Sequence, residues 1–145
     1  MPRTLSPPAG AATSVVRHRV PFYDTDAMRN VHHANFVRYL ELARVQFLAE
    51  QLVPYTEFLA RGLHFAVTRC EVDFLRPARF DDTLEIRCWL TRVGGASLAL
   101  AYRVECGGEL LATGTTEHAL VDDDGRPTRL PADWRDPLRR LAPSD

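Results

Sequence analysis

The chain contains no lysine, since all 18 of its basic residues are arginine. Without a lysine amine, Schiff-base catalysis and the lysine-dependent phosphate-binding loop are both excluded. The chain also lacks an excess charge of one sign, because 19 acidic residues leave a net charge of -1. A chain with this charge balance has no excess of positive charge with which to bind nucleic acid or an anionic lipid surface. We therefore expect no nucleic-acid partner and no membrane partner.

Long hydrophobic runs and cysteine pairs are absent as well. The first 14 residues, MPRTLSPPAGAATS, hold no apolar core of a signal peptide, and no later segment is long and uncharged enough to span a bilayer. Cys70, Cys88 and Cys106 are an odd number without CxxC spacing, which favours neither a disulfide framework nor a zinc site. These absences predict a protein of the reducing cytoplasm that holds no metal.

The first half of the chain reads as a strand, a polar loop and a long helix. Residues 15–22 alternate between apolar and polar side chains, as a half-buried strand does. Residues 23–35, YDTDAMRNVHHAN, follow neither period and are rich in ionisable groups, which indicates a structured loop. Asn35 is a suitable N-cap, and the apolar spacing after it predicts a helix from Phe36 to about Val53. This helix is apolar on more than one face, so we expect other elements to enclose it.

After residue 60 the hydrophobic period changes to two. Segments 66–74, 84–90, 98–104 and 110–121 alternate, and glycine pairs at 94–95 and 107–108 mark hairpins. One strand, one helix and four antiparallel strands predict an α+β fold in which about five strands wrap a central helix. Uncovered sheet edges favour an oligomer. We expect one domain at 15–125, between a flexible tail at 1–14 and a C-terminal tail at 126–145 with a short helix near 133–141.

Two motifs carry a family resemblance. The run YDTDAMRNVHHANFVRYLELAR and the later PARFDDTLEI resemble hot-dog-fold acyl thioesterases of the 4-hydroxybenzoyl-CoA thioesterase and YbgC type. The resemblance covers roughly residues 15–122 with the elements in the right order. It implies hydrolysis of an acyl-CoA or acyl-carrier-protein thioester, no metal or organic cofactor, and a homodimer or homotetramer with sites between subunits.

The resemblance also implies roles for residues of the polar loop. Asp26 matches the carboxylate that attacks the thioester carbonyl or activates water, and the backbone amide of His33 matches the oxyanion donor. Asp24 matches the first aspartate of the D-x-D element, Asn35 the asparagine at the helix start, and Glu41 an acidic helix residue that is a possible accessory group. Without the resemblance, Asp26 reads as a turn carboxylate and Glu41 as an ion-pair partner of a neighbouring arginine.

Substrate contacts are predicted for further residues. We expect Phe36, Tyr39 and Thr68 to line the acyl pocket, and Arg76 and Arg79 to meet coenzyme A phosphates, although solvated strand-end arginines look the same in sequence.

Two departures from the family pattern concern the pocket. Met28-Arg29-Asn30 stands where the family loop usually has glycine, and Phe22 stands where some relatives keep a tyrosine.

Two other functions are alternatives to thioester hydrolysis: a non-catalytic acyl-CoA-binding module, and a hot-dog hydratase or dehydratase. Hot-dog hydratases and dehydratases resemble a pattern with an HFPGH-like element or a histidine five residues after the aspartate. This chain has no such element, and Val31 lies five residues after Asp26.

Overall fold

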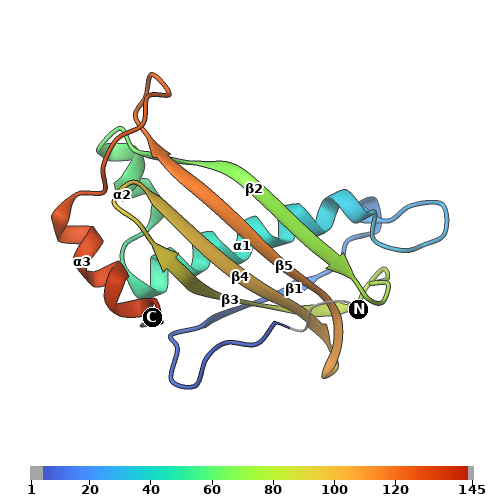
Figure 1. Ribbon diagram of the computed structural model, residues 1–145. Helices are drawn as coiled ribbons and strands as arrows, with labels where there is room; N and C mark the ends of the chain where they lie inside the picture. The colour runs from blue at the N-terminus through green and yellow to red at the C-terminus, as the bar shows by residue number, and fades with distance from the viewer. Residues whose placement is uncertain (1–4, 144–145) are drawn as a thin grey trace.

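The structure, a computed structural model, describes residues 5–143 and contains five strands and three α-helices within that range. The elements follow the order β1 (Ser14–Arg19), η1 (Phe22–Asp24, a 3-10 turn), α1 (His33–Gln51), α2 (Tyr55–Ala60), β2 (His64–Phe74), β3 (Thr83–Val93), β4 (Ser97–Cys106), β5 (Glu109–Val121) and α3 (Ala132–Leu141). Figure 1 shows α1 running across one face of the sheet. The first four residues of the N-terminal tail and the last two of the C-terminal tail lie outside the described range.

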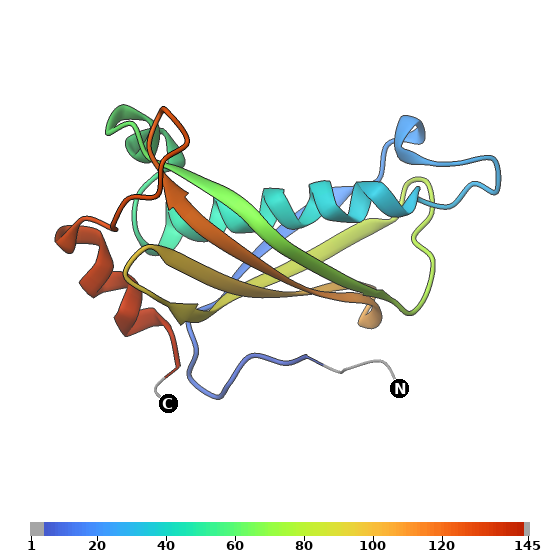
Figure 2. The same ribbon diagram turned by 45° about the horizontal axis from the view of Figure 1, so that its top comes forward.

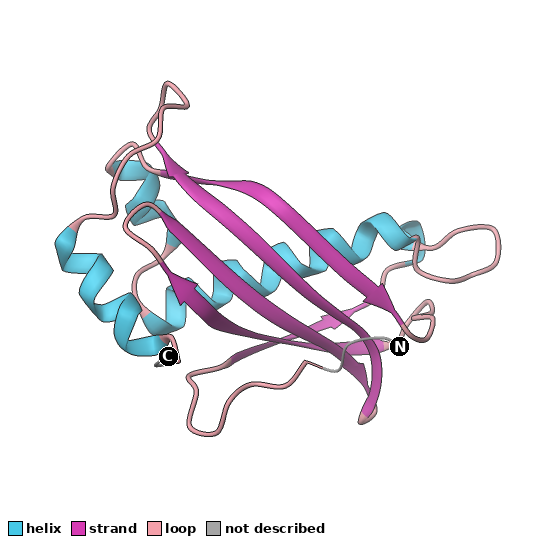
Figure 3. Cartoon of the chain, in the orientation of Figure 1, coloured by secondary structure: helices cyan, strands magenta, loops and turns pink. Residues whose placement is uncertain are grey.

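All five strands form one antiparallel sheet in the order β1-β3-β4-β5-β2. The sheet curls round α1, and Figure 3 shows the helix in its concave face. This arrangement is the hot-dog fold, so the predicted fold class is confirmed. The glycine pair at the β4–β5 hairpin adopts positive φ angles, 58° at Gly107 and 82° at Gly108, as a tight hairpin turn requires.

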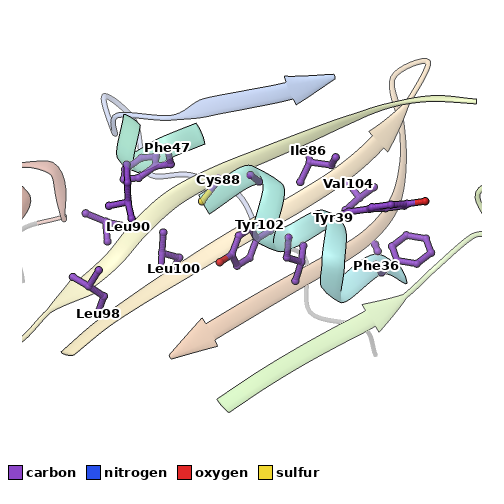
Figure 4. Close-up of a cluster of buried hydrophobic side chains, with 14 of the residues drawn as sticks. Phe36, Tyr39, Phe47, Ile86, Cys88, Leu90, Leu98, Leu100, Tyr102 and Val104 are labelled. Atoms are coloured by element: carbon purple, nitrogen blue, oxygen red, sulfur yellow. The ribbon is translucent and has the colours of Figure 1, made fainter. Parts of the chain in front are cut away.

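The core lies between α1 and the inner face of the sheet. The predicted apolar stripe of α1 is buried, with Phe36, Tyr39 and Phe47 each at most 3% exposed. These side chains meet alternate residues of β3 and β4 (Figure 4), namely Ile86, Cys88, Leu90, Leu98, Leu100, Tyr102 and Val104. A Cβ on Gly114 of β5 would lie 3.0 Å from a Leu40 methyl carbon and 3.2 Å from the Glu71 carbonyl oxygen. Glycine at this position therefore lets the helix approach the sheet closely.

The two ends of the molecule are different. At one end α3 packs beside α2, where the Trp134 and Phe58 rings lie 4.3 Å apart between centroids and Arg61 pairs with Asp133. At the other end lie the loop that leads into α1 and the loop between β2 and β3 (Figure 2). An isolated bridge between Asn30 and Arg79 joins these two loops. The polar loop is thus held by a backbone contact at the end of the molecule that lacks α2 and α3.

The sheet does not enclose α1 on every side. Leu42 and Val45 are 44% and 42% exposed, so the expectation of a helix enclosed by this chain's own elements is wrong for these positions. The reason is that β2 is an edge strand of the sheet and nothing within residues 5–143 continues beyond it. Val67 and Phe74 of β2 are both 51% exposed. An apolar surface therefore follows one side of α1 and the edge strand.

Candidate functional site

Asp26 lies on an exposed turn ahead of α1. Its backbone carbonyl accepts a hydrogen bond from Arg29 N–H at 2.9 Å, and its own N–H donates to the Asn30 carbonyl at 2.8 Å. The carboxylate oxygen Oδ1 accepts from the N–H groups of Met28 and Asn30, at 2.9 and 3.2 Å. Oδ2 has no hydrogen bond to any residue that the structure describes. The turn therefore fixes the carboxylate through one oxygen and leaves the other available to a reactant.

The turn carries backbone strain at Arg29, whose φ is 67°. A left-handed conformation costs a residue with a Cβ roughly 1 kcal/mol or more, whereas glycine adopts it readily. Arg29 belongs to the segment that departs from the family's glycine. The loop therefore forms without the family's glycine at the cost of a strained backbone conformation at Arg29.

Helix α1 begins three residues earlier than the sequence predicts. Its N-cap is His32, whose Nδ1 accepts from the Ala34 N–H at 3.1 Å, so the prediction of Asn35 as the N-cap is wrong. The Asn35 amide instead donates to the Asp24 carbonyl at 2.8 Å, where it ties the helix to the loop. As the first helical residue, His33 has no intrahelical acceptor for its N–H, and the positive end of the helix dipole lies at this point.

Asp24 is buried, only 5% exposed, behind the loop that carries Asp26. Its Oδ2 accepts a hydrogen bond from the Tyr39 hydroxyl at 2.6 Å. Burial raises the pKa of Tyr39, and the Asp24 carboxylate raises it further, so the phenol remains a donor. The Asp24 carbonyl also accepts from the His32 N–H at 2.9 Å. Asp24 and Tyr39 therefore join the loop to the first turns of α1.

A surface pocket brings four of the predicted residues together: Asp26, His33, Phe36 and Arg76. The aromatic wall includes Phe74, whose ring centroid lies 5.3 Å from that of Phe36 in an edge-to-face arrangement. Arg76 forms an exposed ion pair with Glu109 beside the pocket. An exposed carboxylate, a helix N-terminus and an apolar wall therefore face one space. A carbonyl compound bound there would meet a base or nucleophile and a hydrogen-bond donor together.

The other predicted residues lie outside this pocket. Arg79 is exposed in the neighbouring loop. It lines an adjoining surface pocket, to which Arg76 also contributes. Thr68 is exposed on β2, where its hydroxyl donates to the Glu117 carbonyl at 3.1 Å. Glu41 is farther along α1 and lies 3.5 Å from Arg44, which is the ion pair expected from the helical spacing.

Sequence reasoning missed a second, more enclosed pocket beside α1. His118 contributes a buried polar group and Arg44 a half-buried one, with apolar neighbours such as Leu48 and Phe65. From the sequence, His118 is interpreted as a structural histidine of the last strand, and Arg44 as one of the two arginines, with Arg38, that are spaced to pair with Glu41. A signal is present, because Arg44 follows buried Ala43 within the apolar stripe of the helix, where arginine is unusual.

The described residues 5–143 form neither a metal site nor a membrane-spanning helix. Within residues 5–143, no three His, Cys, Asp or Glu side chains are grouped so as to hold a metal ion. Over the same range, none of the helices combines the length and apolar character needed to cross a membrane.

Comparisons with known proteins agree with this architecture. Residues 20–139 match the model of the thioesterase-like superfamily. An acyl-CoA thioester hydrolase, YbgC, of Escherichia coli is 36% identical over 86 residues, which are 59% of this chain and 64% of that protein. An acyl-CoA thioesterase, YbgC, of Haemophilus influenzae is 30% identical over 105 residues, 72% of this chain and 77% of that protein.

A solved structure extends the similarity to the whole fold. The crystal structure of a Thermus thermophilus protein superimposes with a TM-score of 0.87 and 38% sequence identity, and it covers 92% of this chain and all of that one. The family match includes the loop with Asp26, helix α1 and every strand after it. The chain therefore belongs to the thioesterase-like superfamily and has its hot-dog fold.

Proposed function

We propose that this protein is an acyl-CoA thioesterase in which Asp26 is the nucleophile or general base and the His33 N–H is the oxyanion donor. The observation that carries the proposal is the single pocket that Asp26 shares with the first residue of α1. The relatives named as acyl-CoA thioesterases support the reaction class. A thioester is activated enough that one carboxylate and a preorganised donor are sufficient in kind.

The reaction begins with the thioester oxygen near the His33 N–H. Asp26 Oδ2 either attacks the carbonyl carbon or removes a proton from a water that attacks it, and negative charge develops on the carbonyl oxygen. The N–H and the helix dipole stabilise that charge. The carbon–sulfur bond then breaks and the coenzyme A thiolate takes up a proton. On the nucleophilic route, water hydrolyses the acyl–Asp26 anhydride to release the acid.

Two arginines at the rim of the pocket suit the nucleotide part of the substrate. Arg76 and Arg79 follow β2 and lie on adjoining pockets, where their guanidinium groups can bind phosphate oxygens. An acyl carrier protein presents the same phosphopantetheine arm without the nucleotide. We favour coenzyme A as the carrier, and a carrier-protein thioester is the second substrate to assay. Three free cysteines agree with a cytoplasmic location for this activity.

We also propose that the protein is a homodimer or homotetramer whose subunits pair through β2. This edge strand exposes residues 66–71 on both faces, and the exposed Val67 lies in that run. An unpaired strand edge with apolar neighbours is a surface that a second copy can cover. Light scattering should give two or four times the chain mass of 16.4 kDa. Val67→Glu should shift the mass toward that of the monomer, and a wild-type monomer would contradict the proposal.

The decisive test of the catalytic assignment compares two aspartates with the same local geometry. Asp122 Oδ1 accepts from the N–H groups two and four residues ahead, both at 2.9 Å, as Asp26 Oδ1 does. Asparagine keeps the Oδ1 acceptor in both turns. Thiol release from a panel of aliphatic and aromatic acyl-CoAs is measured for wild type, Asp26→Asn and Asp122→Asn.

We expect Asp26→Asn to lower kcat at least about a hundredfold, since a nucleophile or general base is lost, while Asp122→Asn keeps wild-type activity. Equal activity of Asp26→Asn and wild type would show that another group performs the chemistry. If wild type releases thiol from no CoA ester and no carrier-protein ester but binds a non-hydrolysable acyl-CoA, the protein is an acyl-CoA-binding module. Conversion of an enoyl-CoA without thiol release would indicate a hydratase.

A further inference from the structure

The segment that carries Asp26 is a small hairpin, which starts at Thr25 and ends at Val31. An antiparallel bridge joins these two residues, and the Asp26 N–H donates to the Asn30 carbonyl at 2.8 Å. The hairpin is also held to the loop between β2 and β3, where the Val31 N–H donates to the Ala78 carbonyl at 2.8 Å. These contacts fix the shape of the hairpin and its place against the sheet. None of them involves a residue of α1.

Asp24, the residue directly before the hairpin, receives three hydrogen bonds from the start of α1. Its carbonyl oxygen accepts from the Asn35 side-chain amide at 2.8 Å and from the His32 N–H at 2.9 Å. Its carboxylate accepts from the Tyr39 hydroxyl at 2.6 Å. The three donors are the N-cap of α1 and two residues of its first two turns. Asp24 is therefore the point at which the hairpin is tied to the helix.

The two groups proposed to react both lie close to this point in the chain. Asp26 follows Asp24 by two residues. His33 lies between His32 and Asn35, and both of these neighbours donate to the Asp24 carbonyl. The hydrogen bonds at Asp24 therefore relate the position of the Asp26 carboxylate to that of the His33 N–H. A displacement of about 1 Å between reacting groups can lower a rate by about a hundredfold.

The side chains that make these bonds are not on the surface of the pocket. Asp24 and Tyr39 are only 5% and 2% exposed, and the Asn35 amide is directed to the Asp24 carbonyl. None of the three lines the pocket of Asp26, although their neighbours His33 and Phe36 do. A thioester in that pocket would therefore meet the groups that these residues hold in place, and not the residues themselves.

We propose that Asn35 and Tyr39 are positioning residues for thioester hydrolysis. Through Asp24, they hold the Asp26 carboxylate in place relative to the His33 N–H. This inference rests on the function proposed above, and it assigns the two side chains to the rate of the chemical step and not to affinity for the substrate. Loss of either side chain should therefore lower kcat and leave binding unchanged.

The test compares Asn35→Ala with the matched control Gln51→Ala. Gln51 also donates its side-chain amide from α1 to a backbone carbonyl, that of Thr13 at 3.5 Å, but at the other end of the helix. Both changes remove an amide donor without adding charge, and alanine is the best helix former, so each variant should fold. Circular dichroism and thermal melting verify this.

Two quantities separate positioning from binding. The kcat is measured by thiol release from the acyl-CoA that wild type hydrolyses fastest. The Kd is measured by calorimetry for the thioether analogue of that ester, in which a methylene group replaces the carbonyl. Because the analogue has no carbonyl oxygen, its affinity does not depend on the His33 N–H.

We expect Asn35→Ala to lower kcat at least about tenfold with an unchanged Kd, and Gln51→Ala to match wild type in both. Tyr39→Phe, which removes the bond to the Asp24 carboxylate, should also lower kcat and keep the Kd. A weaker Kd in Asn35→Ala would show that Asn35 contacts the substrate, and an unchanged kcat would show that the hairpin keeps its place without it. Either result overturns the inference while the proposed function stands. If wild type hydrolyses no thioester, the proposed function fails and the inference fails with it.

Discussion

Acid should destabilise this protein through His118. The imidazole is 2% exposed, and burial, with a smaller contribution from Arg44, lowers its pKa from 6.5 to about 4. In the unfolded chain the same imidazole is hydrated and titrates at its ordinary value. Between the two pKa values the unfolded state therefore binds a proton that the folded state does not bind.

The sign and the size of the effect follow from proton linkage. Because the unfolded state holds more protons, the free energy of unfolding falls as the pH falls, by up to about 1.4 kcal/mol per pH unit. The contribution of neutral His118 is fully present above pH 6.5 and is lost by about pH 4. The total loss over this range is roughly 3 kcal/mol, which is a large part of the stability of a small domain.

Urea unfolding of wild type and His118→Phe between pH 7 and pH 4 isolates this contribution. The other ionisable groups are present in both proteins, so their effect cancels in the difference between the two unfolding free energies. That difference should fall by roughly 3 kcal/mol as the pH falls, because phenylalanine has no proton to bind. Parallel pH profiles would show that the folded protein binds a proton at His118 as readily as the unfolded chain, and would refute the reasoning.

Two further predictions concern the loop ahead of α1. Arg29→Gly should raise the free energy of unfolding by about 1 kcal/mol in urea titrations, because Arg29 has a φ of 67°, whereas Arg29→Ala should bring no such gain. Tyr39→Phe should lower the free energy of unfolding by about 2 kcal/mol, because buried Asp24 loses a charge-assisted hydrogen bond. The control Tyr23→Phe, at a residue that is 83% exposed, should leave the free energy of unfolding unchanged. If Arg29→Gly does not raise the free energy of unfolding, the argument from strain is wrong. If Tyr39→Phe does not lower it, the argument from the Asp24 hydrogen bond is wrong.

Hydrophobic periodicity predicted the fold because the buried residues of each helix and strand repeat at the spacing of that element. The stripe that includes Phe36, Tyr39 and Phe47 is buried as expected, and each alternating segment of the second half is a strand. These patterns depend only on 3.6-residue and two-residue repeats, which every helix and strand with one buried face shares. The glycine pairs likewise marked both hairpins that join β3 to β4 and β4 to β5.

The start of α1 and the His118 pocket could not be predicted in this way. Asn35 has the better capping side chain by statistics, but its amide is engaged by Asp24, eleven residues earlier, and His32 caps the helix in its place. The pocket depends on contacts even farther apart in sequence, since it sets Arg44 of the helix beside His118 of the last strand. No spacing rule relates residues that meet only through tertiary packing.

Asp26 and Asp122 show why a turn carboxylate does not reveal its role by sequence. Both form the same turn, in which one oxygen accepts from the backbone two and four residues ahead. Beyond Asp122 the chain continues into exposed residues 123–127. Beyond Asp26 it leads into the first turn of α1 and an aromatic wall at Phe74. The turn supplies a rigid carboxylate in both places, and only at Asp26 do a helix N-terminus and an apolar surface lie where a thioester could meet it.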